Sequence, residues 1–174
     1  MDHYIYALGF FDGVHIGHQA LLSAVKGLCR EEKSGVITFA AHPDTLVTGQ
    51  TPKLINTPQD RVKLLKHYGM DRVVTLPFDQ RMRDTDWQAF LRELEEKQGA
   101  AGFVCGEDFR FGKFGAGNAR TLGAYCESRG LPWAVVPEQV RSGIRESSTA
   151  IREMLEYMER TYPGCRMDLV INPD

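Results

Sequence analysis

The chain has no long run of basic residues, no apolar stretch of membrane-spanning length and no signal-peptide pattern at its N-terminus. Its formal net charge is only −2, so the composition gives no support for a nucleic-acid partner. The missing apolar stretch and the missing leader predict a soluble protein of the cytoplasm that does not bind a membrane.

Paired cysteines are also lacking. The cysteines are widely separated and form no Cys-x-x-Cys pair; they are Cys29, Cys105, Cys126 and Cys165. This spacing favours free thiols in a reducing compartment over a disulfide framework or a zinc knuckle. The chain contains no internal repeat, low-complexity tract or linker, and its 43% hydrophobic and 25% charged residues are typical of a globular domain.

Apolar runs and helical patterns alternate along the chain. The runs predicted as buried strands cover residues 4–8, 35–40, 72–76, 102–106 and 132–136. Strands alternating with helices favour an α/β fold, namely a Rossmann-like, doubly wound parallel five-stranded sheet with helices on both faces. Ligands of such sheets bind beyond the carboxyl ends of the strands.

Local signals predict where several helices begin and what they bury. Thr57 is expected to cap a helix that starts at Pro58, and Thr85 with Gln88 has the spacing of a capping box. The helix over residues 149–159 is expected to pack through its apolar side chains, which are Ile151, Met154, Leu155 and Met158. We assign residues 1–160 to one domain and residues 161–174 to a C-terminal tail, with a short strand pattern at residues 168–171.

The stretch from Gly9 to His18 organises the chain, because it joins the first strand to the first helix. Its glycines let the backbone approach a ligand closely and adopt positive φ. The helix entrance offers unpaired N–H groups and the positive end of the helix dipole. His15 and His18 can both reach one anion there, so the stretch is predicted to hold a polyphosphate.

Two other interpretations of this histidine pair stay open on local chemistry alone. A tight turn can carry two surface histidines without any ligand. His-x-x-His can also supply two zinc ligands, although a zinc site needs a third, and His42 is the only other histidine in a suggestive context.

A loop rich in glycine and phenylalanine follows the fourth predicted strand. Residues 105–118 contain four glycines, three phenylalanines, Arg110 and Lys113. Aromatic faces beside cationic groups suit a planar ring joined to phosphates. The alternative, which local chemistry alone favours, is a flexible loop pinned to the core by its phenylalanines. The glycines lack Gly-x-Gly-x-x-Gly spacing, and Lys113 lacks the hydroxyl residue that follows in a P-loop.

A second helix entrance carries hydroxyl groups and an arginine. Ser147, Ser148 and Thr149 stand at this entrance, and Arg152 lies within the first turn. Hydroxyls, N–H groups and a guanidinium fork can bind an anion, whereas plain N-capping by Ser148 or Thr149 is the alternative. We expect Arg152 to be exposed, as a first-turn arginine usually is, and free to bind such an anion.

Four blocks together resemble one enzyme family. His-x-Gly-His after a first strand resembles the signature of the nucleotidylyltransferase superfamily, and the string from Phe11 to Gln19 is similar to the FMN adenylyltransferase domain of prokaryotic FAD synthetases. Residues 38–43, 106–118 and 147–152 resemble further blocks of that family. The blocks extend from about residue 5 to about residue 155 and follow the order of the family.

The resemblance implies transfer of AMP from ATP to FMN, which gives FAD and pyrophosphate, with Mg²⁺ arriving on ATP and no metal ligand assigned to a side chain. It implies catalytic roles for His15, His18 and Arg152. It implies an ATP site made of Gly9, Phe10, Phe11, Asp12, Gly13, His15, Gly17, His18, Ser147, Ser148, Thr149 and Arg152. It implies a flavin site made of His42, Asp108, Phe109, Arg110, Phe111 and Asn118.

The sequence also departs from that family. The family often has Asn where this chain has Phe10 and Pro where it has Ala41. It usually continues into a riboflavin kinase domain, for which the residues after the last predicted helix are too few, so a separate riboflavin kinase is an expected partner. The sequence does not decide between a stand-alone enzyme and a cut-down chain.

Two other functions stay open. One is nucleotide transfer to a different phosphorylated acceptor, and the other is a catalytically silent module that binds flavin or nucleotide.

Overall fold

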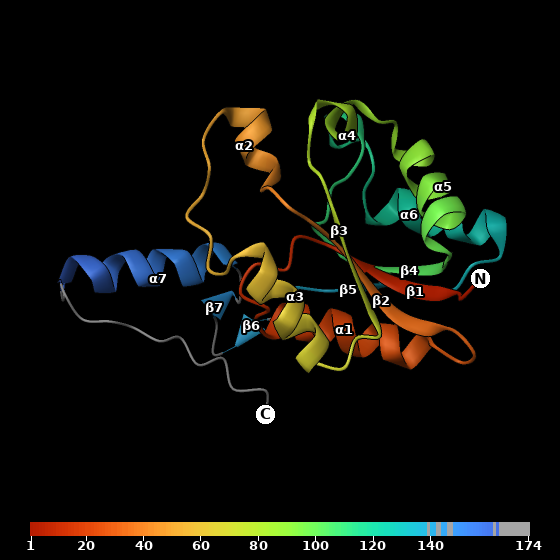
Figure 1. Cartoon of the computed structure of the whole chain (residues 1–174), viewed down its shortest axis with the longest axis horizontal. Helices are drawn as coiled ribbons and strands as arrows, with labels where there is room; N and C mark the ends of the chain where they lie inside the picture. Colours follow the sequence, from red (N-terminus) through yellow and green to blue (C-terminus); the bar gives the residue numbers. More distant parts are fainter. Residues whose placement is uncertain (139, 142–143, 146–147, 162, 164–174) are drawn as a thin grey trace.

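A central parallel sheet of five strands organises the protein (Figure 1), as seen in a computed structural model that describes residues 1–138, 140–141, 144–145, 148–161 and 163. The strands are β1 (Tyr4–Leu8), β2 (Lys33–Phe39), β3 (Arg72–Leu76), β4 (Ala100–Gly106) and β5 (Trp133–Val136). They lie in the order β3-β2-β1-β4-β5, and all four neighbouring pairs are parallel. The chain therefore winds outwards from β1 in both directions, which confirms the predicted doubly wound α/β fold.

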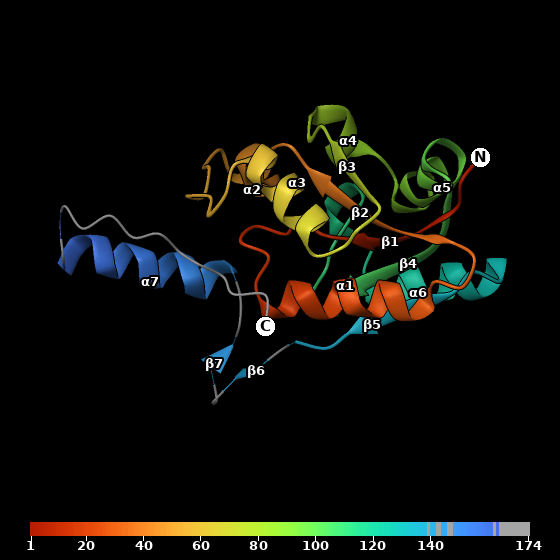
Figure 2. The same ribbon diagram turned by 60° about the horizontal axis from the view of Figure 1, so that its bottom comes forward.

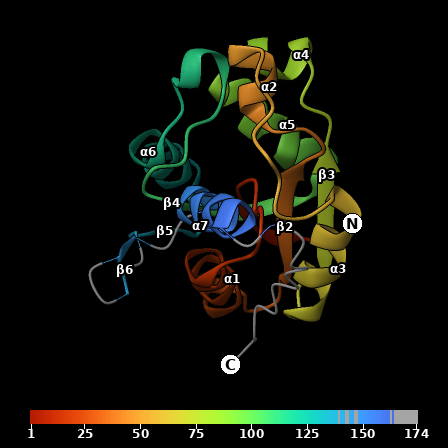
Figure 3. The same ribbon diagram turned by 90° about the vertical axis from the view of Figure 1, so that its left-hand side faces the viewer.

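Helices cover both faces of the sheet, as the end-on view makes plain (Figure 3). One face carries α1 (Ile16–Leu28) and α3 (Pro58–His67), and the other carries α5 (Trp87–Gln98) and α6 (Ala119–Arg129). Every residue of β1 is buried, because alternate side chains enter the two cores: Ile5 and Ala7 join the first, and Tyr6 and Leu8 join the second. Within the described residues, no helix is both long and apolar enough to cross a membrane.

The helix-start signals have mixed outcomes. Thr57 caps α3 as predicted, because its hydroxyl accepts the backbone N–H of Asp60 at 3.1 Å and Pro58 takes the first position. The capping box at Thr85 is wrong. Asp86 caps α5 instead, since its carboxylate accepts two backbone N–H groups, while the Thr85 hydroxyl donates to a carbonyl of the preceding helix α4 (Gln80–Asp84).

Several short elements lie outside the predicted alternation. They are α2 (Pro43–Thr48), α4, the 3-10 turn η1 (Lys113–Gly115) and an antiparallel hairpin of β6 (Val140–Arg141) and β7 (Ile144–Arg145). None spans enough residues to show a hydrophobic period in the sequence.

The last helix, α7 (Ser148–Thr161), extends away from the sheet and its covering helices (Figures 1 and 2). The expected packing of its apolar side holds only in part: Ile151, Leu155 and Met158 are half-buried, but none is fully buried and Met154 is 53% exposed. The amphipathic pattern predicted the helix correctly but not its burial, because burial depends on whether another element lies against it. Residues 168–171, where a strand was expected, lie outside the described residues.

The carboxyl ends of the parallel strands converge at one edge, as the fold class requires. At the end of β2, the Thr38 hydroxyl donates to the Phe10 carbonyl at 2.7 Å. Two residues beyond β1 and three beyond β2, the rings of Phe10 and His42 meet edge to face, with centroids 4.7 Å apart. The predicted binding edge therefore brings together the unusual loops of the sequence.

Replacing Gly35 by alanine is expected to destabilise the fold. A Cβ at Gly35 would lie 2.4 Å from the ring of Tyr6, which is fully buried on the neighbouring strand and donates to the Gln98 carbonyl. We expect Gly35→Ala to lower the free energy of unfolding by about 1–3 kcal/mol, measured by urea denaturation. The control is Gly27→Ala in α1, where the new methyl group meets open space and should raise the free energy of unfolding by about 0.4–1 kcal/mol. Equal stabilities of the two variants would contradict this account of β1–β2 packing.

Candidate functional site

The turn after β1 has an unusual backbone. Phe11, Gly13 and Val14 all have positive φ, at 61°, 81° and 40°. Such a conformation is a genuine outlier for the β-branched Val14. The side chains of Phe11 and Val14 are fully buried in the core beneath α1, which holds the turn in this shape. Strain kept in place by packing is typical of binding and catalytic sites.

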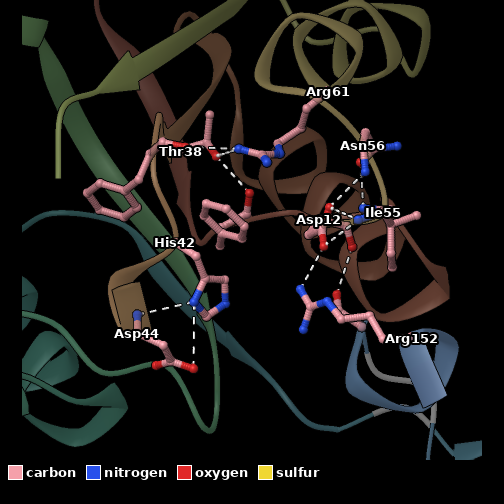
Figure 4. A network of polar contacts seen from close by, with 12 residues as sticks. Asp12, Thr38, His42, Asp44, Ile55, Asn56, Arg61 and Arg152 are labelled. Atoms are coloured by element: carbon pink, nitrogen blue, oxygen red, sulfur yellow. Dashed lines mark hydrogen bonds and ion pairs between the residues drawn. The ribbon is translucent and has the colours of Figure 1, made fainter. Parts of the chain in front are cut away.

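Asp12 joins this turn to two distant segments (Figure 4). Its side chain is 1% exposed, and its carboxylate accepts the backbone N–H groups of Ile55 and Asn56 at 3.0 Å. The same carboxylate accepts Nη2 of Arg152 at 2.6 Å, while the Ser148 hydroxyl donates to the Asp12 carbonyl at 2.7 Å. A single buried carboxylate therefore positions the turn, the start of α3 and the start of α7.

The two histidines lie at the entrance of α1. His15 is the N-cap, and its Nδ1 accepts the backbone N–H of His18 at 3.4 Å, so the proton of a neutral His15 ring is on Nε2. The two rings stack with centroids 3.7 Å apart and planes at 18°. The sequence prediction that both histidines serve one location is consistent with this stacking.

Both imidazoles are uncharged at neutral pH. Burial lowers the pKa of His15 to about 4, a shift that the nearby Asp12 charge opposes and the Arg152 charge reinforces. Burial also holds the pKa of His18 well below its ordinary value, with further lowering from His15, Arg61 and Arg152. Neutral rings can donate a hydrogen bond to a phosphate oxygen, and an arriving anion would raise both pKa values.

Buried polar atoms without a partner gather around the turn. Within the described residues they include Nδ1 of His18, Nε of Arg152, and Nε and Nη2 of Arg61. Buried polar groups almost always have a hydrogen-bond partner, and each exception calls for an explanation. Since three of these four atoms belong to arginine donors, the arrangement fits a site that receives an anion.

Two cavities meet beside the turn. The first, of about 220 Å³, is lined at the strand ends by Gly9, His15, Gly17, His18, Gly106, Asp108 and the start of the segment after β5. The second, of about 780 Å³, is lined largely by aromatic side chains, which are Phe10, Phe39, Phe78, Phe90, Phe109, Phe111 and Phe114. Phe10 and Phe109 line both cavities. A small cleft that the two histidines line and a larger aromatic pocket therefore share one wall.

The residues predicted to bind ATP occupy different environments in the structure. Those lining the smaller cavity are Gly9, Phe10, His15, Gly17 and His18. Phe11, Asp12 and Gly13 are buried and shape the turn. Thr149 is exposed, and Ser147 lies outside the described residues.

Arg152 differs from its prediction. Its side chain is only 14% exposed and is paired with Asp12, so the expectation of a free, exposed arginine is wrong. The physical reason is tertiary: the carboxylate that attracts it comes from a turn 140 residues earlier in the chain.

The residues predicted to bind flavin also divide. Phe109, Arg110 and Phe111 line the larger cavity, whereas Asp108 lines the smaller one. Asn118 caps α6 in a capping box with Thr121, and His42 caps α2 by accepting the backbone N–H of Asp44. The structure thus brings the middle of the loop to the cavity and leaves its end to cap a helix.

Sequence reasoning missed Arg61, which is the largest fully buried side chain and lies next to Phe10. A signal was available. Arg61 stands in the first turn of α3, where the helix dipole disfavours a positive charge, so a special environment could have been suspected.

The zinc interpretation gains no support from the geometry. Among the described residues, no three His, Cys, Asp or Glu side chains form a group able to hold a metal ion. The suggested third ligand, His42, packs its ring against Phe10.

Comparison with known sequences is consistent with these observations. The family model for FAD synthetase matches residues 2–150. A bifunctional riboflavin kinase/FMN adenylyltransferase of Listeria monocytogenes is 28% identical over 155 residues, covering 87% of this chain and 49% of the relative. A protein of the same name from Escherichia coli K12 is 30% identical, covering 87% of this chain and 50% of the relative. The chain spans about half the length of these two curated relatives.

Solved structures share the fold. One is described as a macrolide-efflux protein from Streptococcus pneumoniae; it has a TM-score of 0.76 at 26% identity and covers 88% of this chain and 52% of its own. Another is a pantoate-beta-alanine ligase from Francisella tularensis, with a TM-score of 0.58 at 14% identity, covering 98% of this chain and 74% of its own. The second likeness concerns the fold alone.

Removing the Asp12 carboxylate should destabilise the protein strongly. Asp12→Ala leaves the half-buried Arg152 guanidinium without its partner and two backbone N–H groups unsatisfied, so we expect a loss of about 3–5 kcal/mol in the free energy of unfolding. Thermal and urea unfolding measure it. The control is Asp2→Ala, which breaks an exposed pair with Lys33 and should leave the melting temperature nearly unchanged. An Asp12→Ala protein as stable as wild type would mean that the three segments are held by other contacts.

The neutral histidines predict a pH dependence. Between pH 4 and pH 6.5 the unfolded chain holds a proton on His15 that the folded protein lacks, so stability should rise with pH across this window. If a polyphosphate binds here, its charge raises the histidine pKa values, and binding should take up protons at pH 5.5.

Calorimetric titration with pyrophosphate in two buffers of different ionisation enthalpy measures this proton uptake. It should be reduced in His15→Asn and kept in His67→Asn, which alters an exposed histidine at the end of α3. An apparent binding enthalpy that does not depend on the buffer would refute the phosphate assignment of the pair.

Proposed function

Because the chain belongs to the FAD synthetase family, we propose that it transfers AMP from ATP to the phosphate of FMN, giving FAD and pyrophosphate. The observation that carries this proposal is the shared wall between a small cleft, which His15 and His18 line at the α1 entrance, and a large aromatic pocket. A reaction that joins a nucleotide to a flavin needs two such sites in contact, so that the reacting phosphates meet.

The smaller cavity suits the phosphates of ATP. His15 and His18 line it together with Gly9 and Gly17, at the positive end of α1. We assign both histidines as donors to phosphate oxygens, with His18 contacting the reacting phosphoryl group. ATP enters as its magnesium complex. Asp12 does not fit the role of a metal ligand, because its carboxylate oxygens already accept from two backbone N–H groups and Arg152.

The chemistry requires no nucleophilic side chain. The acceptor phosphate is already an anion and attacks the α-phosphorus in line, and pyrophosphate leaves from the opposite side. The protein then contributes alignment of the two substrates and stabilisation of the charge that develops on the phosphoryl oxygens. Neutral imidazoles fit this role, since each retains an N–H group that can donate to a phosphoryl oxygen.

Arg152 and Ser148 connect α7 to this site. Both contact Asp12, and Nε of Arg152 is buried without a partner among the described residues. We propose that Arg152 holds the turn through Asp12 and offers its remaining donors to the outer phosphates of ATP. Ser147 and Thr149 belong to the same proposed entrance.

The larger cavity suits the flavin ring system. Its aromatic lining matches a planar apolar ring, and Arg110 and Lys113 add positive charge to its wall, whereas Arg83 is paired there with Asp84. Phe109 and Phe111 stack on each other with centroids 5.7 Å apart, which gives the pocket a rigid wall. His42 and Asn118 act indirectly in this assignment, by shaping the loops at the cavity.

FMN has to be supplied by phosphorylation of riboflavin. The relatives from Listeria and E. coli carry riboflavin kinase in their names beside FMN adenylyltransferase. We propose that a riboflavin kinase, separate from the residues of this chain, provides the substrate. The cytoplasm, which contains both ATP and flavins, is the proposed location.

A second acceptor is favoured by one observation. Phe10 lines both cavities, at a position where the resembling family often has Asn. A ring at this position changes the passage between the cavities and could select another phosphorylated acceptor.

One incubation tests the proposed reaction. The protein is mixed with ATP and Mg²⁺ and given either FMN or riboflavin, and the products are identified by chromatography and mass. We expect FAD from FMN, and no FMN from riboflavin.

His18→Ala is the matched inactive variant and should lower the rate of FAD formation by roughly 10²-fold or more, because it removes a donor aimed at the reacting phosphoryl group. His67→Ala, at an exposed histidine, should turn over like wild type. Nucleotide transfer to another phosphorylated acceptor but never to FMN would move the assignment to the second candidate. FMN produced from riboflavin would overturn the domain assignment.

A further inference from the structure

Arg61 is a buried cation that the fold uses only in part. It is fully buried, and its Nη1 donates to the Phe39 carbonyl at 2.9 Å and to the Thr38 hydroxyl at 3.4 Å. Its Nε and Nη2 have no partner within the described residues. Figure 4 shows the Arg61 side chain reaching toward the end of β2.

The charge of Arg61 is poorly compensated. An arginine remains protonated in proteins, so burial cannot neutralise it. The nearest acidic influence is Asp12, which is already shared among two backbone N–H groups and Arg152. A buried cation with unpaired donors costs stability unless a water molecule or a ligand completes its hydrogen bonding.

The ring of Phe10 covers this guanidinium. The Cζ atom of Arg61 lies 4.1 Å from the centre of the Phe10 ring, and His42 meets the same ring edge to face. Phe10 also lines both cavities. Arg61 therefore lies directly behind the boundary at which, under the proposed function, the acceptor phosphate meets the α-phosphate of ATP.

We propose that Arg61 binds the phosphate of the phosphorylated acceptor, and that Phe10 turns aside from the guanidinium to admit it. This inference rests on the proposed function. The guanidinium loses its cation–π contact with Phe10 in this exchange and gains charge-assisted hydrogen bonds to the phosphate, so the lost contact is compensated. Side-chain rotation is also fast compared with turnover, so this gate adds no slow step.

The test compares two ligands that differ only by a phosphate. Binding of FMN and of riboflavin is measured by quenching of flavin fluorescence, without ATP, for wild type and Arg61→Met. Wild type should bind FMN about 10- to 100-fold more tightly than riboflavin, the range expected for charge-assisted hydrogen bonds. Arg61→Met should bring that ratio close to one and leave the riboflavin affinity unchanged.

Controls separate ligand binding from a structural role. Lys63→Met removes an exposed charge from the same helix and should keep the wild-type ratio. Arg61→Met should melt no earlier than wild type, because it removes a buried charge. An early melting temperature with an unchanged ratio would make Arg61 structural and overturn the proposal. If Arg61→Met does not fold, Arg61→Lys decides. It keeps the charge but not the planar fork, so a reduced ratio supports the proposal and an unchanged ratio overturns it.

The remaining outcomes distinguish the two proposals. FAD formation by a wild-type protein that binds FMN and riboflavin equally would overturn the role of Arg61 and leave the proposed function intact. Absence of binding to either flavin would overturn both.

Discussion

The carboxylate of Asp12 is the interaction on which the candidate site depends. It is buried at the strained turn after β1 and holds the backbone before α3 and the arginine of α7 at the same time. A buried carboxylate is stable only when its lone pairs are satisfied, and here three donors from two distant segments satisfy them. The same bonds fix the backbone on which His15 and His18 stand, so the geometry of the histidines depends on them.

Binding and stability make opposite demands at this edge of the sheet. A fold optimised for stability would not bury two neutral histidines together with unpaired donor atoms of Arg61 and Arg152. Each unpaired buried group costs free energy. A bound anion would accept hydrogen bonds from these groups, and the free energy lost in burying them would be recovered on binding. The aromatic pocket complements them, because it is apolar and requires little desolvation of an entering planar ring. Unpaired polar groups lie on one side of Phe10, and the aromatic pocket lies on the other. This arrangement fits a protein that brings a phosphate and a ring system together.

Sequence reasoning located most of the candidate site because its signals are local. The Gly9–His18 turn, the phenylalanine-bearing loop after β4 and the entrance of α7 each carry their chemistry within a few residues. Sequence reasoning failed mainly where the position of a side chain depends on a contact with a residue that is distant in sequence. Arg152 pairs with Asp12, and Arg61 was not suspected at all. The Thr85 cap failed for a local reason, because the neighbouring Asp86 caps α5 instead. The capping role of Asn118 at α6 was also missed, although the local spacing to Thr121 could have revealed it.

The sequence by itself determined the alternation of strands and helices, and hence the doubly wound sheet and the edge at which its unusual loops gather. Hydrophobic periodicity and turn chemistry are properties of neighbouring residues, and they act before any tertiary contact forms. Only the tertiary structure decided that α7 has no fully buried residue, that two cavities share Phe10, and that a buried arginine lies behind that ring. These features depend on which distant surfaces meet and on what each burial leaves unpaired, and no period or spacing along the chain contains that information.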